Sequence, residues 1–179
     1  MMRLLLGVSS LALTLAGPIG HNCISTMPLQ GTPKGTPFSD KAMVATRIDK
    51  ELVIYGYTEC SDVIGDLMSF TLILADSINQ NRTKLKRAGP DVGKCPGFTF
   101  PSSRVYKAAI YADESRVYGI RLLSVIGVSD IGSLRGTPVL FEFGSSQLPI
   151  GFYGTYTDAG VTSLGFLTHD PNCVRYVPP

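Results

Sequence analysis

The stretch FEFGSSQLPIGFYGTYTDAGVTSLGFLT, residues 141–168, decides the fold class of this chain. Its beginning alternates between two faces, with Val139, Phe141 and Phe143 on one and Leu140, Glu142 and Gly144 on the other. This period of two is typical of a half-buried strand. Leu164 and Phe166 alternate with their neighbours in the same way, and the glycines between the two segments permit backbone conformations closed to other residues. The stretch therefore predicts two strands joined by a polar turn, and none of its residues is arranged for chemistry.

The rest of the chain from residue 41 onward continues this pattern of strands and turns. Runs rich in β-branched and apolar residues cover 44–48, 51–57, 68–75, 104–111 and 116–123. An Asp-Glu-Ser turn at residues 113–115 separates the last two runs. Residues 79–96 are predicted to form a long loop or a hairpin extension, and no segment has a convincing helical period. We therefore predict an all-β domain of antiparallel sheets over residues 41–179.

Composition limits the protein to a globular class. Charged residues make up 17% of the chain and hydrophobic residues 44%, which excludes a disordered chain. The net charge is +2, and the basic stretch NQNRTKLKR at residues 79–87 makes no extended nucleic-acid footprint, so we expect no nucleic-acid partner. The simplest interpretation of this stretch is a solvated loop. An acidic-glycan contact and a protease site after Arg87 are the functional alternatives.

The N-terminus predicts export. Residues 1–16 have the pattern of a secretory signal peptide, with Arg3 before an apolar core and the small-residue cleavage site Thr14-Leu15-Ala16. An uncleaved anchor is the alternative, but Gly17-Pro18 ends the apolar run short of the roughly 20 residues that a membrane span needs. We expect a secreted, extracellular protein with no membrane span after cleavage.

The cysteines fit that compartment. Cys23, Cys60, Cys95 and Cys173 form an even set without a CxxC spacing, so neither a redox motif nor a zinc site is predicted, and no other metal or cofactor is expected. Two disulfides are expected, and sequence alone allows three pairings. We favour Cys23–Cys173 with Cys60–Cys95, because the first pair flanks the domain and domain termini often lie close together.

Residues 17–40 differ in composition from the rest. Pro, Thr and Gly dominate them from residue 24 onward, with Pro28, Pro33 and Pro37 as the most restrictive positions. Such a segment has little means of burying itself, so we expect an extended arm. It is either a flexible leader or a connector that lies along another copy of the chain or a neighbouring coat protein.

A single N-glycosylation sequon occurs, Asn81-Arg82-Thr83. Its polar neighbours are typical of an exposed loop. Asn81 is therefore a candidate glycosylation site in an exported chain.

The order of motifs in residues 141–168 resembles the last strands of jacalin-related lectins. The matching residues are Phe143-Gly144, Leu148-Pro149, Gly151-Phe152-Tyr153-Gly154 and Ser163-Leu164-Gly165-Phe166. Residues 117–122 fit the preceding strand of that family more loosely. The resemblance implies a β-prism, which has three antiparallel sheets around a pseudo-threefold axis, and reversible binding of carbohydrate.

The same resemblance implies a sugar-binding loop. The family's loop has the pattern G-x-x-x-D, in which backbone N–H groups and the Asp carboxylate hold sugar hydroxyls. Residues with that spacing are present here as Gly154, Thr155, Tyr156, Thr157 and Asp158. The chain departs from the family at one point, because the family's Asp comes just before the closing strand, where this sequence has Thr162.

Aromatic residues extend this candidate site. Aromatic rings stack on the apolar faces of sugars. Tyr153 lies inside the matched strand and is expected to be core, whereas Tyr156 is either a sugar-stacking ring or a loop-filling residue.

The sequence shows no catalytic constellation. No G-x-S-x-G elbow marks a nucleophile for His169, and no spacing pairs Asp113, Glu142 and Asp158 as glycosidase carboxylates. We therefore expect no enzyme. The first hypothesis is a secreted lectin that binds glycans or glycoproteins. The alternative is a structural subunit of an extracellular coat, matrix or filament built on the same fold.

Overall fold

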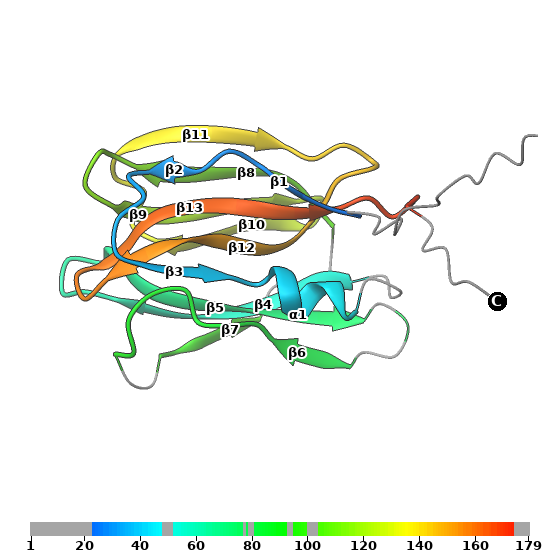
Figure 1. Ribbon diagram of the computed structural model, residues 1–179, viewed down its shortest axis with the longest axis horizontal. Coiled ribbons are helices and arrows are strands. Elements are labelled where there is room, and N and C mark those ends of the chain that lie inside the picture. The colour runs from blue at the N-terminus through cyan, green and yellow to red at the C-terminus, as the bar shows by residue number, and fades with distance from the viewer. Residues whose placement is uncertain are drawn as a thin grey trace, which may run out of the picture.

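The computed structural model describes residues 23–47, 52–76, 78, 81–92, 95–99 and 104–173. The predicted signal peptide, residues 1–16, lies outside the described residues. The described part is almost entirely antiparallel β-structure, arranged in three sheets (Figure 1). The predicted all-β class with antiparallel sheets is confirmed. No helix among the described residues is long and apolar enough to cross a membrane.

The three sheets differ in which parts of the chain form them. The first sheet has the order β1-β13-β12-β3, with β2 pairing on β13, and it joins the two ends of the described chain. Its strands are β1 (Ile24–Thr26), β2 (Gln30–Gly31), β3 (Thr36–Ser39), β12 (Leu148–Thr157) and β13 (Gly160–His169). The second sheet has the order β6-β5-β4-β7, from β4 (Leu52–Ser61), β5 (Leu67–Asp76), β6 (Arg82–Lys84) and β7 (Gly97–Thr99). The third has the order β10-β9-β8-β11, from β8 (Val105–Ala112), β9 (Val117–Ser124), β10 (Gly127–Gly132) and β11 (Thr137–Glu142).

Phenylalanines from all three sheets meet in the core. Phe152 of β12 lies 4.7 Å from Phe166 of β13 and 5.0 Å from Phe70 of β5, measured between ring centroids. Phe141 of β11 and Phe143 just after it each lie 5.2 Å from Phe166. Offset and edge-on rings at these distances attract one another in addition to burying apolar surface. The alternation of Phe141 and Phe143 with exposed neighbours, predicted from the sequence, therefore points at the centre of the molecule.

Most of the predicted strands are present, with one exception. The runs at 51–57, 68–75, 104–111 and 116–123 correspond to β4, β5, β8 and β9, and residues 113–115 form the turn between β8 and β9. The strand predicted at 44–48 is wrong at its start, because residues 41–45 form the short helix α1 (Lys41–Ala45). The β-branched Val44 belongs to this single turn, where it is fully buried.

Residues 24–39 are extended, as expected, but they do not form an arm separate from the domain. β1 pairs with residues 167–169 of β13, β2 with Ser163 and Leu164, and β3 with residues 153–156 of β12. The expected boundary at residue 41 is therefore wrong as the start of the fold. The Pro- and Gly-rich segment has few large side chains to bury, and its extended backbone satisfies its hydrogen bonds on the edges of the β12–β13 hairpin instead.

Two disulfides join the sheets and loops as favoured from the sequence. Cys23 bonds to Cys173, with a Cα–Cα distance of 5.5 Å, and Cys60 bonds to Cys95 at 4.9 Å. The first ties the strand that opens the described chain to the residues after β13. The second links β4 to the loop before β7. The predicted pairing is confirmed.

Candidate functional site at the β12–β13 turn

The predicted sugar-binding residues lie at the end of a β-hairpin. Thr157 pairs with Gly160, so β12 and β13 are joined by only Asp158 and Ala159. Gly160 has a φ of +120°, a conformation that side chains disfavour. The sequence predicted a loop over residues 154–158, but the structure corrects this: residues 154–157 belong to β12 and only Asp158 lies in the turn.

The hydroxyl of Thr155 is used inside the protein. It accepts a hydrogen bond from the backbone N–H of Lys34 at 3.0 Å. It also lies 2.8 Å from the hydroxyl of Thr162 and 2.7 Å from that of Ser163. Thr162 in turn donates to the carbonyl of Lys34 at 2.5 Å. This network pins residues 32–35 across the hairpin and leaves the Thr155 side chain no free role in binding a ligand.

The two tyrosines of β12 have different partners. The hydroxyl of Tyr153 donates to the carbonyl of Met27 at 2.5 Å, and its ring covers Gly165, so this residue is structural. Tyr156 is half-buried, and its ring centroid lies 6.4 Å from that of Phe38. Part of the Tyr156 ring therefore stays exposed beside the turn.

Asp158 is the exposed acid of the hairpin. Its carboxylate makes no hydrogen bond or ion pair with any other residue in the described part of the chain. Thr162, at the position where the lectin family carries its Asp, is 5% exposed and lies within β13. The Thr162 side chain is therefore buried, whereas the Asp158 side chain is exposed to solvent.

Three loops from the other sheets meet beside this turn. We call them, together with the β12–β13 turn, the turn end: residues 62–66, 113–116, 133–136 and 158–159 (Figure 1). Their centre is Asp66, which is 1% exposed. It accepts hydrogen bonds from Ser133 Oγ at 2.6 Å and from Arg135 Nε at 3.0 Å, and the second guanidinium contact makes the Arg135 pair bidentate. Such fork-to-carboxylate geometry is the strongest form of ion pair in proteins.

Arg116 lies between the hairpin turn and the Asp66 cluster and contacts both. Its guanidinium donates to the carbonyl of Leu67 at 3.1 Å and lies 3.5 Å from a carboxylate oxygen of Asp62 and 3.9 Å from one of Asp66. A Cβ added at Gly160 would lie only 3.0 Å from the same guanidinium. Sequence reasoning missed Asp66, Arg116 and Arg135, because they come from three separate loops and no local spacing connects them.

The other acids considered for catalysis have structural partners. The Asp113 carboxylate accepts from the hydroxyls of Ser115 and Tyr118, both at 2.6 Å, and these bonds hold its pKa well below the usual range. Glu142 pairs with Lys107 on the third sheet at 2.7 Å. No group of three or more His, Cys, Asp or Glu side chains that could hold a metal ion occurs in the described ranges.

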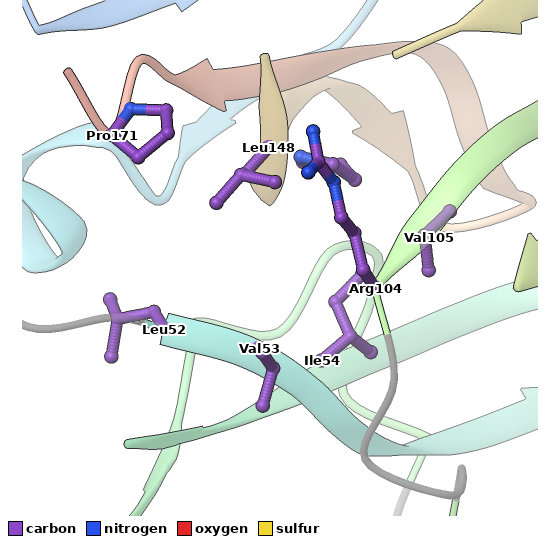
Figure 2. Close-up of a pocket in the computed structure, with 8 residues that line it drawn as sticks. Leu52, Val53, Ile54, Arg104, Val105, Leu148 and Pro171 are labelled. Carbon is purple, nitrogen blue, oxygen red and sulfur yellow. The ribbon is translucent and has the colours of Figure 1, made fainter. Parts of the chain in front are cut away.

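An apolar pocket lies away from the hairpin turn. It has a cavity volume of about 150 Å³, and its walls come from the starts of β4, β8 and β12 and from Pro171. Figure 2 shows Leu148 and Pro171 on one side of the pocket and Leu52 of β4 on the other, with Arg104 along the edge beside Leu148. The Arg104 guanidinium donates to the carbonyl of Gly144 at 2.5 Å. The pocket contains none of the predicted site residues.

Comparisons with known proteins address the fold. No known family profile and no characterised relative matches the sequence. Solved structures do match: a mannose-specific jacalin-related lectin from Morus nigra is 16% identical with a TM-score of 0.60, over 81% of this chain and 94% of that one. A mannose-binding jacalin-related lectin from Ananas comosus is also 16% identical with a TM-score of 0.60, over 83% and 99%. Single-chain recombinant jacalin is 13% identical with a TM-score of 0.60, over 81% and 93%. The predicted resemblance is thus confirmed at the level of structure, and this chain has the β-prism fold of the jacalin-related lectins.

Proposed function

We propose that this protein is a secreted, non-catalytic carbohydrate-binding protein whose ligand is held at the β12–β13 turn. The observation that carries the proposal is Asp158: an exposed carboxylate with no partner in the described part of the chain, placed at the end of the hairpin in a β-prism. Its partners are glycans, free or on glycoproteins.

The turn offers two complementary contacts for a sugar. A carboxylate accepts hydrogen bonds from two adjacent hydroxyls, and charge makes these bonds stronger than neutral ones. The half-buried ring of Tyr156 presents an apolar surface to a sugar face. Thr155 contributes indirectly, since its hydroxyl network fixes the strand that presents both side chains. Gly154 and Thr157 contribute backbone N–H and C=O groups to the site. The Thr157 hydroxyl accepts a hydrogen bond from the backbone N–H of Ala159 at 3.3 Å.

Several features support the remaining parts of the proposal. The predicted signal peptide and the two disulfides favour an oxidising, extracellular compartment. Asp113 and Glu142 are held in hydrogen bonds and an ion pair, which favours binding over hydrolysis. Mannose is the ligand of two proteins with this fold, so it is the first sugar to test.

The alternative, a structural subunit of a coat, matrix or filament, has less support. It depended on a free arm that reaches a neighbour. Residues 24–39 instead pair with β12 and β13 of their own chain, so no specific observation now favours it.

A glycan array followed by titration with mannose tests the proposal. We expect the mature protein to bind at least one glycan class, and Asp158→Ala to reduce that affinity by about tenfold or more, which is the loss of one or two charge-assisted hydrogen bonds. Glu114→Ala is the matched control, because it removes one exposed negative charge from the turn end without touching the hairpin. Equal affinity of the Asp158→Ala variant and the parent protein would eliminate this site.

A further inference from the structure

A groove crosses the outer face of the β6-β5-β4-β7 sheet. Its volume is about 470 Å³, and every strand of the sheet contributes to it. Arg82 and Lys84 come from β6, Ile73 from β5, Tyr55 from β4, and Gly97 to Thr99 from β7. The glycine at position 97 keeps the β7 side open. None of these described lining residues is acidic.

Two cations on one side of the groove lack an anionic partner. Arg82 and Lys84 are both exposed, and neither makes an ion pair within the described ranges. They lie two residues apart on a strand, which puts both side chains on one face about 6.6 Å apart. Five other basic side chains are paired with a carboxylate: Arg87, Lys107, Arg116, Arg121 and Arg135.

The floor and far side of the groove are aromatic or apolar. The guanidinium of Arg82 lies 3.9 Å from the centre of the Tyr55 ring, a cation–π contact that holds the charge over the groove. Ile73 lies between the cations and β7. Phe98 lines the groove on the β7 side, and its ring stacks on the buried Tyr57. A matching ligand therefore has anionic groups along one edge and apolar surface across its body.

We propose that this groove binds a sulfated polysaccharide chain. Sugar rings offer apolar faces for the floor, and sulfate groups offer the oxygens that guanidinium and ammonium groups bind. A nucleic acid fits less well, because the net charge is only +2 and two cations make a small footprint. The groove belongs to a different sheet from the β12–β13 turn, so this site does not depend on the sugar site proposed there.

The glycosylation sequon Asn81-Arg82-Thr83 lies beside the groove, so the binding experiment needs protein without a glycan at Asn81. Asn81 directly precedes Arg82 and is exposed, so a glycan attached there would cover the cations. All proteins in the experiment therefore carry Asn81→Gln. The glycosylated parent serves as a comparison, and we expect it to bind more weakly.

Titration with dextran sulfate and with uncharged dextran of equal length tests the proposal. We expect binding of dextran sulfate only, and a loss of about tenfold in Arg82→Ala/Lys84→Ala, the effect of two exposed charge contacts. The slope of log affinity against log salt should fall by about 1.4, the value for two charges on a flexible polyanion. The matched control Lys41→Ala/Lys107→Ala removes the same charge from exposed positions on other elements and should change affinity less than about twofold.

Three results would overturn the proposal. One is equal weakening by both double variants, which would indicate a response to net charge alone. Another is a DNA oligonucleotide that binds as tightly as dextran sulfate with the same dependence on Arg82 and Lys84. The third is absence of dextran sulfate binding. Loss of the Arg82–Tyr55 contact could unfold the double variant. In that case the Lys84→Ala single variant is the test, because Lys84 has no side-chain partner in the described ranges. This variant should still bind dextran sulfate more weakly than the parent. Mannose binding at the hairpin is measured separately, so failure of either site leaves the other testable.

Discussion

Two buried carboxylates hold loops in place in different parts of the molecule, and they do so by different physics. Asp66 lies at the turn end and is 1% exposed, and Asp40 lies where the N-terminal segment meets β12 and is 3% exposed. Asp66 bonds to Arg135 and Ser133 and faces Arg116. Asp40 bonds to backbone N–H groups, of Phe152 at 3.0 Å and of Lys86 at 3.1 Å. Asp66 is compensated mainly by charged side chains, whereas Asp40 is compensated mainly by backbone dipoles.

The pKa values separate accordingly. Burial raises the pKa of Asp40 to about 6, and the two backbone hydrogen bonds and the Lys86 charge only partly offset it. Burial also acts to raise the pKa of Asp66. There the hydrogen bonds from Ser133 and Arg135 and the charges of Arg135 and Arg116 outweigh burial, so the pKa is lowered. Two similarly buried carboxylates thus have pKa shifts in opposite directions, and the charge of their partners decides the direction.

The largest expected effect comes from removing Asp66. Asp66→Ala removes three hydrogen bonds to a buried carboxylate, one from Ser133 and two from Arg135. Bonds to a charged group contribute about 1.5–3 kcal/mol each, and because the Arg135 side chain is itself more than half exposed we expect a reduced total loss of about 3–5 kcal/mol in the free energy of unfolding. Urea unfolding at pH 7 measures this. Asp62→Ala removes a more exposed acid that lies beside the same Arg116 and accepts hydrogen bonds from the backbone N–H groups of Ile64 and Asp66, and it should cost less. A loss below about 1 kcal/mol for Asp66→Ala would mean that the turn end does not depend on charge.

The next largest effect comes from the Cys23–Cys173 disulfide. It lies at the start of the N-terminal segment, residues 24–39, and Asp40 follows the end of that segment. Cys23→Ser with Cys173→Ser should reduce the free energy of unfolding by about 2–4 kcal/mol, because the bridge limits the unfolded chain over 150 residues. Denaturation of this variant and of the parent protein gives the value. If β1 to β3 of this variant remain protected from hydrogen exchange, Asp40 and strand pairing are enough to hold residues 24–39 on the hairpin. If all three strands lose protection, the disulfide is what holds them there.

A third prediction uses pH to isolate Asp40. A carboxyl whose pKa is higher in the folded state binds its proton more readily there, so its contribution to stability increases as pH falls from 7 toward 4. The shift from 3.8 to about 6 limits this gain to about 3 kcal/mol. In Asp40→Asn the gain should disappear, and the difference in unfolding free energy between pH 7 and pH 5 should shrink. An unchanged difference would contradict the assignment.

Asp66 should respond in the opposite direction. Its lowered pKa contributes stability above the unfolded value of about 3.8. That contribution is lost as pH falls below this value. The Asp40→Asn protein should therefore lose stability at acid pH, measured between pH 5 and pH 3, and this loss should be smaller when Asp66→Ala is added.

The smallest expected effect is the coupling between the two sites. Phe152, which is bonded to Asp40, lies five positions before Thr157 at the turn, which corresponds to about 17 Å of strand. Effects at such distances add within roughly 0.5 kcal/mol, so the Asp40→Asn/Asp66→Ala double variant should equal the sum of the single variants. A larger coupling energy would show that the two regions form one network.

Local pattern predicted much of the architecture. The alternation around Phe141 and Phe143, the apolar run that became β5 and the turn at residues 113–115 all depend on neighbours in sequence, and each is present. The cysteine pairing could also be favoured in advance, because the closeness of domain ends is a general property. At the candidate site, the sequence predicted Asp158 and Tyr156 as ligand contacts, and each lies one residue from Thr157, where β12 ends.

Other features could not be read in this way. Residues 24–39 lack a strand signal because their pairing is supplied by the edges of β12 and β13, which lie far away in sequence. Val44 has β-propensity, but the tertiary packing of α1 overrides it. The groove on the second sheet was visible beforehand only as a basic stretch, since Tyr55 and Phe98 reach it from other strands.

By itself, the sequence determined the all-β class, the expectation of two disulfides, the resemblance to one lectin family and the residues of the hairpin, because these depend on short-range periodicity and residue type. Tertiary structure alone decided which hydroxyls and charges remain free. Thr155 and Asp158 are both polar residues of one short motif, yet one is bonded to Lys34, Thr162 and Ser163 and the other is exposed. The reason is physical: a buried polar group must find a partner, and that partner is brought to it by the fold and not by the adjacent sequence.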